Sequence, residues 1–235
     1  MAPSRATGRK RPPRLSDAEE PARQKRAAAR AAAELVEDGM RVGLGTGTTV
    51  AHLLPALAER ELDEIVCAAT SPQTAARARE LGLDVRELDE LGELDIAIDG
   101  ADQIDPRGWL IKGGGAAHTR EKIVAAAARV FVVIASAEKA VEELEPPVPL
   151  ELVAFGALST LGQLDSARLR EGTPISPDGG LIADYLGPVG DPGELAARLS
   201  ATPGVVEHGL FAPELVSLVL IGTDAGVERR EGARR

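Results

Sequence analysis

Cysteine and aromatic residues are scarce in this sequence of 235 residues. There is one cysteine, Cys67, and aromatic residues make up 2% of the chain. A single cysteine forms neither an intramolecular disulfide nor a thiolate metal cluster, so we expect a reducing, cytoplasmic environment. So few aromatic side chains provide no platform for stacking bases, and a net charge of −10 repels phosphate backbones. We therefore expect no nucleic acid partner.

Long apolar runs and clusters of metal ligands are also lacking. No stretch approaches the ~20 apolar residues that a membrane span needs. The first residues lack the apolar core of a signal peptide, so we expect no membrane association. The three histidines, His52, His118 and His208, are scattered without the spacing of metal ligands. We expect neither a metal ion nor a cofactor.

Hydrophobic residues make up 44% of the chain, enough to build a sizeable core. Strand-like and helix-like segments alternate through the first 145 residues, which predicts a Rossmann-like, doubly wound, mostly parallel sheet of the α/β class. The expected strands are 41–44, 65–69, 85–88, 94–98 and 130–135, and the expected helices are 23–36, 50–62, 72–81 and 119–128. Residues 1–20 begin with a basic, proline-rich stretch, and we expect a disordered tail there.

A proline-rich stretch at 145–149 indicates a boundary. Beyond it we expect strands at 150–155, 181–185 and 205–211 and helices at 157–168 and 193–200. This pattern suits a smaller α+β, ferredoxin-like lid domain at 146–213. The apolar stretch 216–221 is expected to return to the first sheet. The catalytic domain would then comprise residues 21–145 and 214–235.

A glycine-rich turn, Gly45-Thr-Gly-Thr-Thr49, leads from the first expected strand into a helix. Backbone amides at a helix N-terminus form a cradle for phosphate, and the candidate ligands are Thr46, Gly47, Thr48 and Thr49. The spacing is not the G-x-G-x-x-G of dinucleotide folds, and the G-K-[ST] of nucleotide loops is missing. A purely geometric role for the turn is the alternative.

Two aspartates, Asp99 and Asp102, follow the strand at 94–98 and are separated by the small residues Gly100 and Ala101. Ligands of open α/β sheets bind at the carboxyl ends of the strands, so this stretch predicts a site for a small polar molecule. Turn capping is the alternative role for aspartates beside glycine.

A lysine and three glycines come about ten residues later. Lys112 precedes Gly113, Gly114 and Gly115, and Thr119-Arg-Glu-Lys122 follows. A lysine beside bare backbone near two acids fits the binding of a small anion. A surface charge is the alternative for Lys112, and a solvated helix glutamate is the alternative for Glu121.

Four motifs in this order resemble the A type of ribose-5-phosphate isomerase, from about Lys25 to Asp224. They are the glycine-rich run 43–49, D-G-A-D at 99–102, K-G-G-G at 112–115 and T-R-E-K at 119–122. The resemblance implies an aldose–ketose isomerase that interconverts D-ribose 5-phosphate and D-ribulose 5-phosphate through an enediol. It implies no metal, a cytoplasmic enzyme, and a homodimer or homotetramer.

The resemblance also implies roles for individual residues. Glu121 would be the general base, and Asp99 and Asp102 would bind hydroxyls near the reacting end. Lys112 would hold the oxyanion, and Lys139 would join the phosphate site, with Lys25 as a further candidate there.

Three departures from the family pattern stand out. Gln103 replaces the glutamate that normally follows D-G-A-D, Ser136-Ala-Glu-Lys139 replaces a run with aspartate and serine, and Asp178-Gly-Gly180 replaces Asn-Gly. The alternatives are a non-catalytic sugar-phosphate regulator and another sugar-phosphate isomerase or deaminase. A nicotinamide oxidoreductase is disfavoured by the glycine spacing.

Overall fold

The computed structural model describes residues 19–234, so residues 1–18 of the expected tail lie outside the described residues. The last two residues of that tail, Glu19 and Glu20, are helical instead. They open α1 (Glu19–Ala33), an alanine-rich helix. Ala28, Ala29 and Ala32 are fully buried, and their small side chains allow the helix to pack closely on the sheet.

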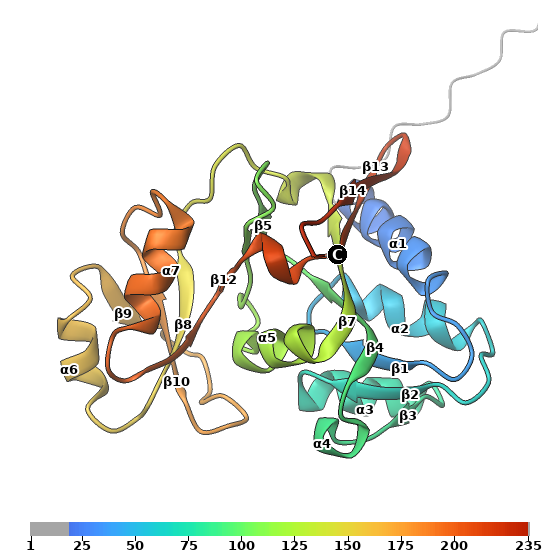
Figure 1. Ribbon diagram of the computed structural model, residues 1–235, viewed down its shortest axis with the longest axis horizontal. Helices are drawn as coiled ribbons and strands as arrows, with labels where there is room; N and C mark the ends of the chain where they lie inside the picture. Colours follow the sequence, from blue (N-terminus) through green and yellow to red (C-terminus); the bar gives the residue numbers. More distant parts are fainter. Residues whose placement is uncertain (1–18, 235) are drawn as a thin grey trace, which may run out of the picture.

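The centre of the fold is a seven-stranded sheet in the order β14-β13-β7-β4-β1-β2-β3 (Figure 1). Neighbouring strands are parallel except for the β13–β14 hairpin at one edge. The strands are β1 (Arg41–Leu44), β2 (Val66–Ala69), β3 (Asp84–Val85), β4 (Leu94–Gly100), β7 (Ala128–Ser136), β13 (Leu218–Thr223) and β14 (Gly226–Glu231). The expected Rossmann-like sheet is confirmed, and β13 returns to it beside β7 as expected.

Helices cover both faces of this sheet and bury two apolar cores. Besides α1 they are α2 (Val50–Ala58), α3 (Pro72–Glu80), α4 (Leu88–Leu91) and α5 (His118–Ala127). The first turn of α3 shows why a helix begins at this point in the sequence. Ser71 Oγ caps the helix by accepting a hydrogen bond from the Thr74 amide, and Pro72 occupies the first helical position.

A second, four-stranded sheet has the order β11-β8-β10-β9, and every neighbouring pair is antiparallel. Its elements are β8 (Val148–Leu152), α6 (Ala157–Gly162), β9 (Ala167–Leu169), β10 (Leu181–Tyr185), α7 (Pro192–Ser200) and β11 (Val205–His208). This βαββαβ sequence is the ferredoxin-like pattern. We call these elements and their connections the small α+β unit. It has its own apolar core.

Several expected element boundaries were wrong. The strand expected at 85–88 pairs only at Asp84–Val85, since Leu88 already begins α4. The helix expected at 157–168 ends at Gly162, and β9 occupies its last part. Helix α2 ends at Ala58 rather than at residue 62.

The strand expected at 205–211 is interrupted at Gly209. Close packing against another part of the backbone requires a glycine at this position. A Cβ there would lie 2.2 Å from the carbonyl oxygen of Lys112. The chain then continues as β12 (Leu210–Phe211), which joins β5 (Gln103–Ile104) and β6 (Leu110–Ile111) in a three-stranded sheet. Helix α5 lies between the seven-stranded sheet and the small α+β unit (Figure 1).

Candidate active site

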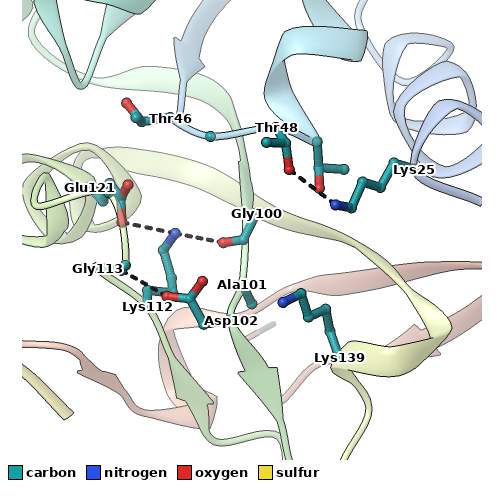
Figure 2. Close-up of a pocket in the computed structure, with 14 residues that line it drawn as sticks. Lys25, Thr46, Thr48, Gly100, Ala101, Asp102, Lys112, Gly113, Glu121 and Lys139 are labelled. Carbon is teal, nitrogen blue, oxygen red and sulfur yellow. Dashed lines mark hydrogen bonds and ion pairs between the residues drawn. The ribbon is translucent and has the colours of Figure 1, made fainter. Parts of the chain in front are cut away.

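The central sheet has a switch point between its neighbouring strands β1 and β4. The strands that follow β1 in the chain, β2 and β3, lie on one side of this point, and β7, which follows β4, lies on the other. Such a switch point, at the carboxyl ends of the strands, is where open α/β sheets bind ligands. A cavity of about 110 Å³ lies there (Figure 2). Its lining residues are Lys25, Thr46, Gly47, Thr48, Thr49, Gly100, Ala101, Asp102, Lys112, Gly113, Gly114, Gly115, Glu121 and Lys139. Asp99 lies directly beneath, 3% exposed.

The glycine-rich turn wraps closely around Asp99. A Cβ on Gly45 would lie 1.9 Å from Asp99 Oδ1, so only glycine fits that position. Gly47 has φ +110°, a backbone conformation that L side chains rarely adopt. The amide of Thr46 donates to Asp99 at 3.1 Å and is thus already engaged. A bound anion would therefore take its hydrogen bonds from the amides of residues 47–49, which directly precede the first residue of α2, Val50.

Two lysines bring positive charge to the same end of the cavity. Lys25 extends from α1 and donates to Thr48 Oγ1 at 3.1 Å, while Lys139 approaches from the opposite side (Figure 2). The N-terminus of α2 adds its partial positive charge. This end of the cavity fits a phosphate group. Sequence analysis placed Lys139 here and named Lys25 as a further candidate, and both line the cavity.

Lys112 is the centre of a buried charge cluster at the other end of the cavity. Its ammonium lies 2.9 Å from Asp99 Oδ2 and 3.0 Å from Glu121 Oε2. It also donates a hydrogen bond to the Gly100 carbonyl at 2.6 Å. Because the Lys112 side chain is 3% exposed, its charge is stabilised by these three partners rather than by water.

Burial sets the proton affinities of this cluster. Desolvation, followed by the repulsion of Asp99, raises the pKa of Glu121 to about 7, although Lys112 opposes the shift. The pKa of Asp99 is also raised by burial, and that of Lys112 is raised by the two carboxylates. Asp99 also accepts hydrogen bonds from the Thr46 and Gly100 amides, which stabilise its charged form and oppose the effect of burial on its pKa.

Asp102 faces the cavity from the next turn. Its carboxylate accepts a hydrogen bond of 2.8 Å from the Gly114 amide, which ties it to the glycine loop 113–115. Its own amide donates to the Ile111 carbonyl. The structure therefore brings both aspartates, Lys112, Glu121 and the glycine-rich turn together around one cavity.

Helix α5 presents Glu121 to the cavity, while the residues around Glu121 bind the small α+β unit. Thr119 donates to the buried carboxylate of Glu151 on β8. Arg120 forms a two-bond ion pair with Asp178. Lys122 binds Glu207 and the His208 carbonyl, each at 2.7 Å. Glu121 is thus held in a helix that is fixed on both sides.

Two of the three departures from the family pattern have structural partners, whereas the buried hydroxyl of Ser136 has none. Both ends of the Gln103 side-chain amide bind the backbone of residue 145: Nε2 donates to the carbonyl and Oε1 accepts from the amide, each at 2.8 Å. An ionised glutamate could not donate. Asp178 pairs with Arg120, and a Cβ on Gly180 would clash with Glu151. Ser136 is buried at the end of β7.

Two further residues, His118 and Arg170, lie against the glycine loop 113–115. His118 is fully buried beneath Gly113, and burial lowers its pKa to about 4, so it is neutral at physiological pH. Arg170 reaches from the small α+β unit to the carbonyls of the glycine loop. A residue 57 positions away in the sequence is joined to this loop only by the fold.

Residues 19–234 contain neither a cluster of metal ligands nor a helix suited to a membrane. No group of three or more His, Cys, Asp or Glu side chains there is arranged to hold a metal ion. None of the helices in that range has the length and apolar character to cross a membrane.

The thiol of Cys67 is buried, and its pKa is raised to about 12.

The fold and the cavity together define the class: an α/β protein with a switch-point site for a small phosphorylated molecule. The model of the family described as ribose 5-phosphate isomerase A (phosphoriboisomerase A) matches residues 66–226. The chain belongs to this family. A shorter match, to the DeoR C terminal sensor domain, covers residues 20–85.

Curated relatives cover nearly the whole chain. A ribose-5-phosphate isomerase A from Caulobacter vibrioides is 48% identical over 88% of this chain and 96% of its own length. One from Methanosarcina acetivorans is 46% identical over 86% and 92%.

Solved structures agree with this fold. A ribose 5-phosphate isomerase A from Methanocaldococcus jannaschii has a TM-score of 0.83 and 35% identity, covering 88% of this chain and 97% of its own. A D-ribose-5-phosphate isomerase in complex with phospho-erythronic acid has a TM-score of 0.84 and 36% identity, with the same coverage.

Proposed function

We propose that this chain interconverts D-ribose 5-phosphate and D-ribulose 5-phosphate, with Glu121 as the general base and without a metal ion. One observation carries the assignment of the base. The Glu121 carboxyl lines the cavity, is 4% exposed, and lies 3.0 Å from Lys112, opposite a turn suited to phosphate. A base is most effective when its pKa lies near the working pH, and burial raises the pKa of Glu121 to about 7.

The phosphate would be bound by the amides of residues 47–49, Lys25 and Lys139. This fixes one end of the sugar, so that its reacting carbons lie near Glu121. Asp99 and Asp102 would accept hydrogen bonds from the sugar hydroxyls and assist ring opening. Asp102 is better placed for direct contact, because it lines the cavity while Asp99 lies beneath it.

In the open-chain aldose, Glu121 would remove the proton from C2. The electrons of that C–H bond form the C1–C2 double bond, and those of the carbonyl move onto O1, giving an enediolate that Lys112 stabilises. A proton passes from O2 to O1, and Glu121 returns its proton to C1 to give the ketose. The electron pair stays within the sugar, so no external oxidant or reductant is consumed.

The assay is turnover of each pentose phosphate by chelator-treated protein. We expect conversion in both directions and no gain on adding zinc or magnesium. Glu121→Gln protein, purified identically, controls for contaminating host isomerase. Activity that vanishes with the chelator and returns with a metal would contradict the proposed mechanism.

A non-catalytic sugar-phosphate sensor is the second candidate, favoured by the match to a sensor domain at residues 20–85. That stretch contains the phosphate turn but ends before Asp99, Lys112 and Glu121. A chain that binds ribose 5-phosphate in calorimetry without converting it would support the sensor.

The enzyme we propose is cytoplasmic and assembles as a homodimer or homotetramer. Two large apolar side chains of the small α+β unit, Phe155 and Leu158, are 92% and 78% exposed, which supports a face covered by a second copy. We also propose that residues 146–213 form a separate domain from 21–145 and 214–235. Light scattering and limited proteolysis test these two proposals.

A further inference from the structure

We propose that Arg170 is a positioning residue that, anchored by Asp184, fixes the peptide planes of the glycine loop 113–115 against the reacting end of the cavity. The proposal rests on the isomerase function proposed above. Arg170 follows β9 in the small α+β unit, and it does not line the cavity.

The Arg170 guanidinium is itself held rigidly. Its Nε and Nη2 donate to the two carboxylate oxygens of Asp184 at 2.9 and 2.6 Å. The side chains of Arg170 and Asp184 are 18% and 15% exposed. This paired geometry orients the guanidinium plane, as a single charged contact would not.

The third nitrogen of the guanidinium faces the glycine loop. Nη1 donates to the carbonyls of Gly113 and Gly114 at 3.2 and 3.1 Å. In a trans peptide the carbonyl and the following N–H point in opposite directions. Holding the Gly113 carbonyl on the Arg170 side therefore directs the Gly114 N–H to the other side, where it donates to Asp102. The Gly115 N–H is directed in the same way by the Gly114 carbonyl.

Glycine needs such an external restraint because its backbone is the least restricted of all residues. Gly113 has φ +101°, and a Cβ there would lie 2.7 Å from the His118 ring. A side chain that would stiffen the loop at position 113 is thus excluded by its surroundings. The Arg170–Asp184 pair supplies the restraint from outside the cavity.

The test compares Arg170→Gln with Arg168→Gln, an exposed arginine two residues earlier. For Arg170→Gln we expect kcat to fall about 10- to 100-fold, because the loop and Asp102 lose their fixed geometry. KM should change less than about threefold, since the phosphate site is untouched. Hydrogen exchange should accelerate in the peptide covering residues 110–117 but not across β8 and β10. Arg168→Gln should match the wild type in all three.

Asp184→Asn is the second variant, for the case in which Arg170→Gln does not fold. It keeps the guanidinium but weakens its anchor, and we expect the same fall in kcat to a smaller extent. Folded variants with kcat within about threefold of wild type, or exchange that accelerates throughout the small α+β unit, would overturn the proposal. A wild-type protein without isomerase activity would instead count against the proposed function, and the exchange experiment would still test the loop.

Discussion

At the scale of single residues, the site depends on how burial changes the acidity of Glu121. The side chain lies in a water-poor position beside Asp99, and both effects disfavour its negative charge. Lys112 opposes them but is shared with Asp99. The carboxyl is therefore poised to exchange a proton near neutral pH.

This acidity predicts the pH profile of the enzyme. Glu121 must be ionised to act as a base, and its pKa is raised to about 7, so kcat/KM should fall as the pH drops below about 7. Initial rates between pH 5 and 9, in buffers of constant ionic strength, measure this. In the Asp99→Asn variant the limb should move to lower pH, because a repelling charge is gone. An activity that stays flat down to pH 5 would contradict the raised pKa.

The residues of the site were largely predictable because they lie in short, dense motifs. Only 23 consecutive positions contain Asp99, Asp102, Lys112 and Glu121. The glycine-rich turn directly follows the strand β1. Arg170 and Glu151 were not predictable, because each reaches the site through the packing of the small α+β unit. The residues next to them in the sequence give no indication of these long-range contacts.

At the scale of elements, the conformation of the turn between β1 and α2 depends on its contacts with Asp99. Gly45 meets the Asp99 carboxylate directly, and the Thr46 amide donates to it. The position of the glycine-rich turn is thus coupled to the buried carboxyl of Asp99.

Gly45→Ala should therefore impair both ends of the cavity. The added methyl would overlap Asp99 Oδ1, at 1.9 Å, so either the carboxylate or the turn must move. We expect kcat/KM to fall at least about 100-fold, on the scale of a misplaced site, with a lower melting temperature. Gly162→Ala in α6, where a Cβ would meet nothing within 4 Å, is the matched control and should behave as wild type. A Gly45→Ala enzyme with near-normal kinetics would refute this coupling.

Strands bounded by turn residues were predicted well, whereas strands of two residues were not. Strands β1 and β10 were located at their exact residues because they are apolar runs bounded by turn residues. The strands β5, β6 and β12 span two residues each and are held by pairing across the chain. Two residues carry no periodicity, so such strands exist only in the tertiary context.

At the scale of the whole molecule, the small α+β unit completes the site by fixing α5 and the glycine loop.

Its exposed apolar side chains, Phe155 and Leu158, lie in the connection after β8 and in α6.

These side chains predict a measurable change in assembly. We expect the wild type to elute as a dimer or tetramer in size exclusion with light scattering. Phe155→Ser combined with Leu158→Ser should shift it toward the monomer, because apolar area is lost from the interface. Val153→Ser alone, half exposed nearby, should have a smaller effect. A wild type that is monomeric at all concentrations would contradict the proposed assembly.

The most direct test of the central claim is the steady-state kinetics of Glu121→Gln, with folding checked by circular dichroism. Glutamine keeps the size of the side chain but cannot accept the C2 proton. General-base catalysis contributes about 10²–10⁴-fold, so we expect kcat to fall at least that far with KM little changed. A well-folded Glu121→Gln enzyme that retains more than about a tenth of the wild-type kcat would contradict the assignment of Glu121 as the base.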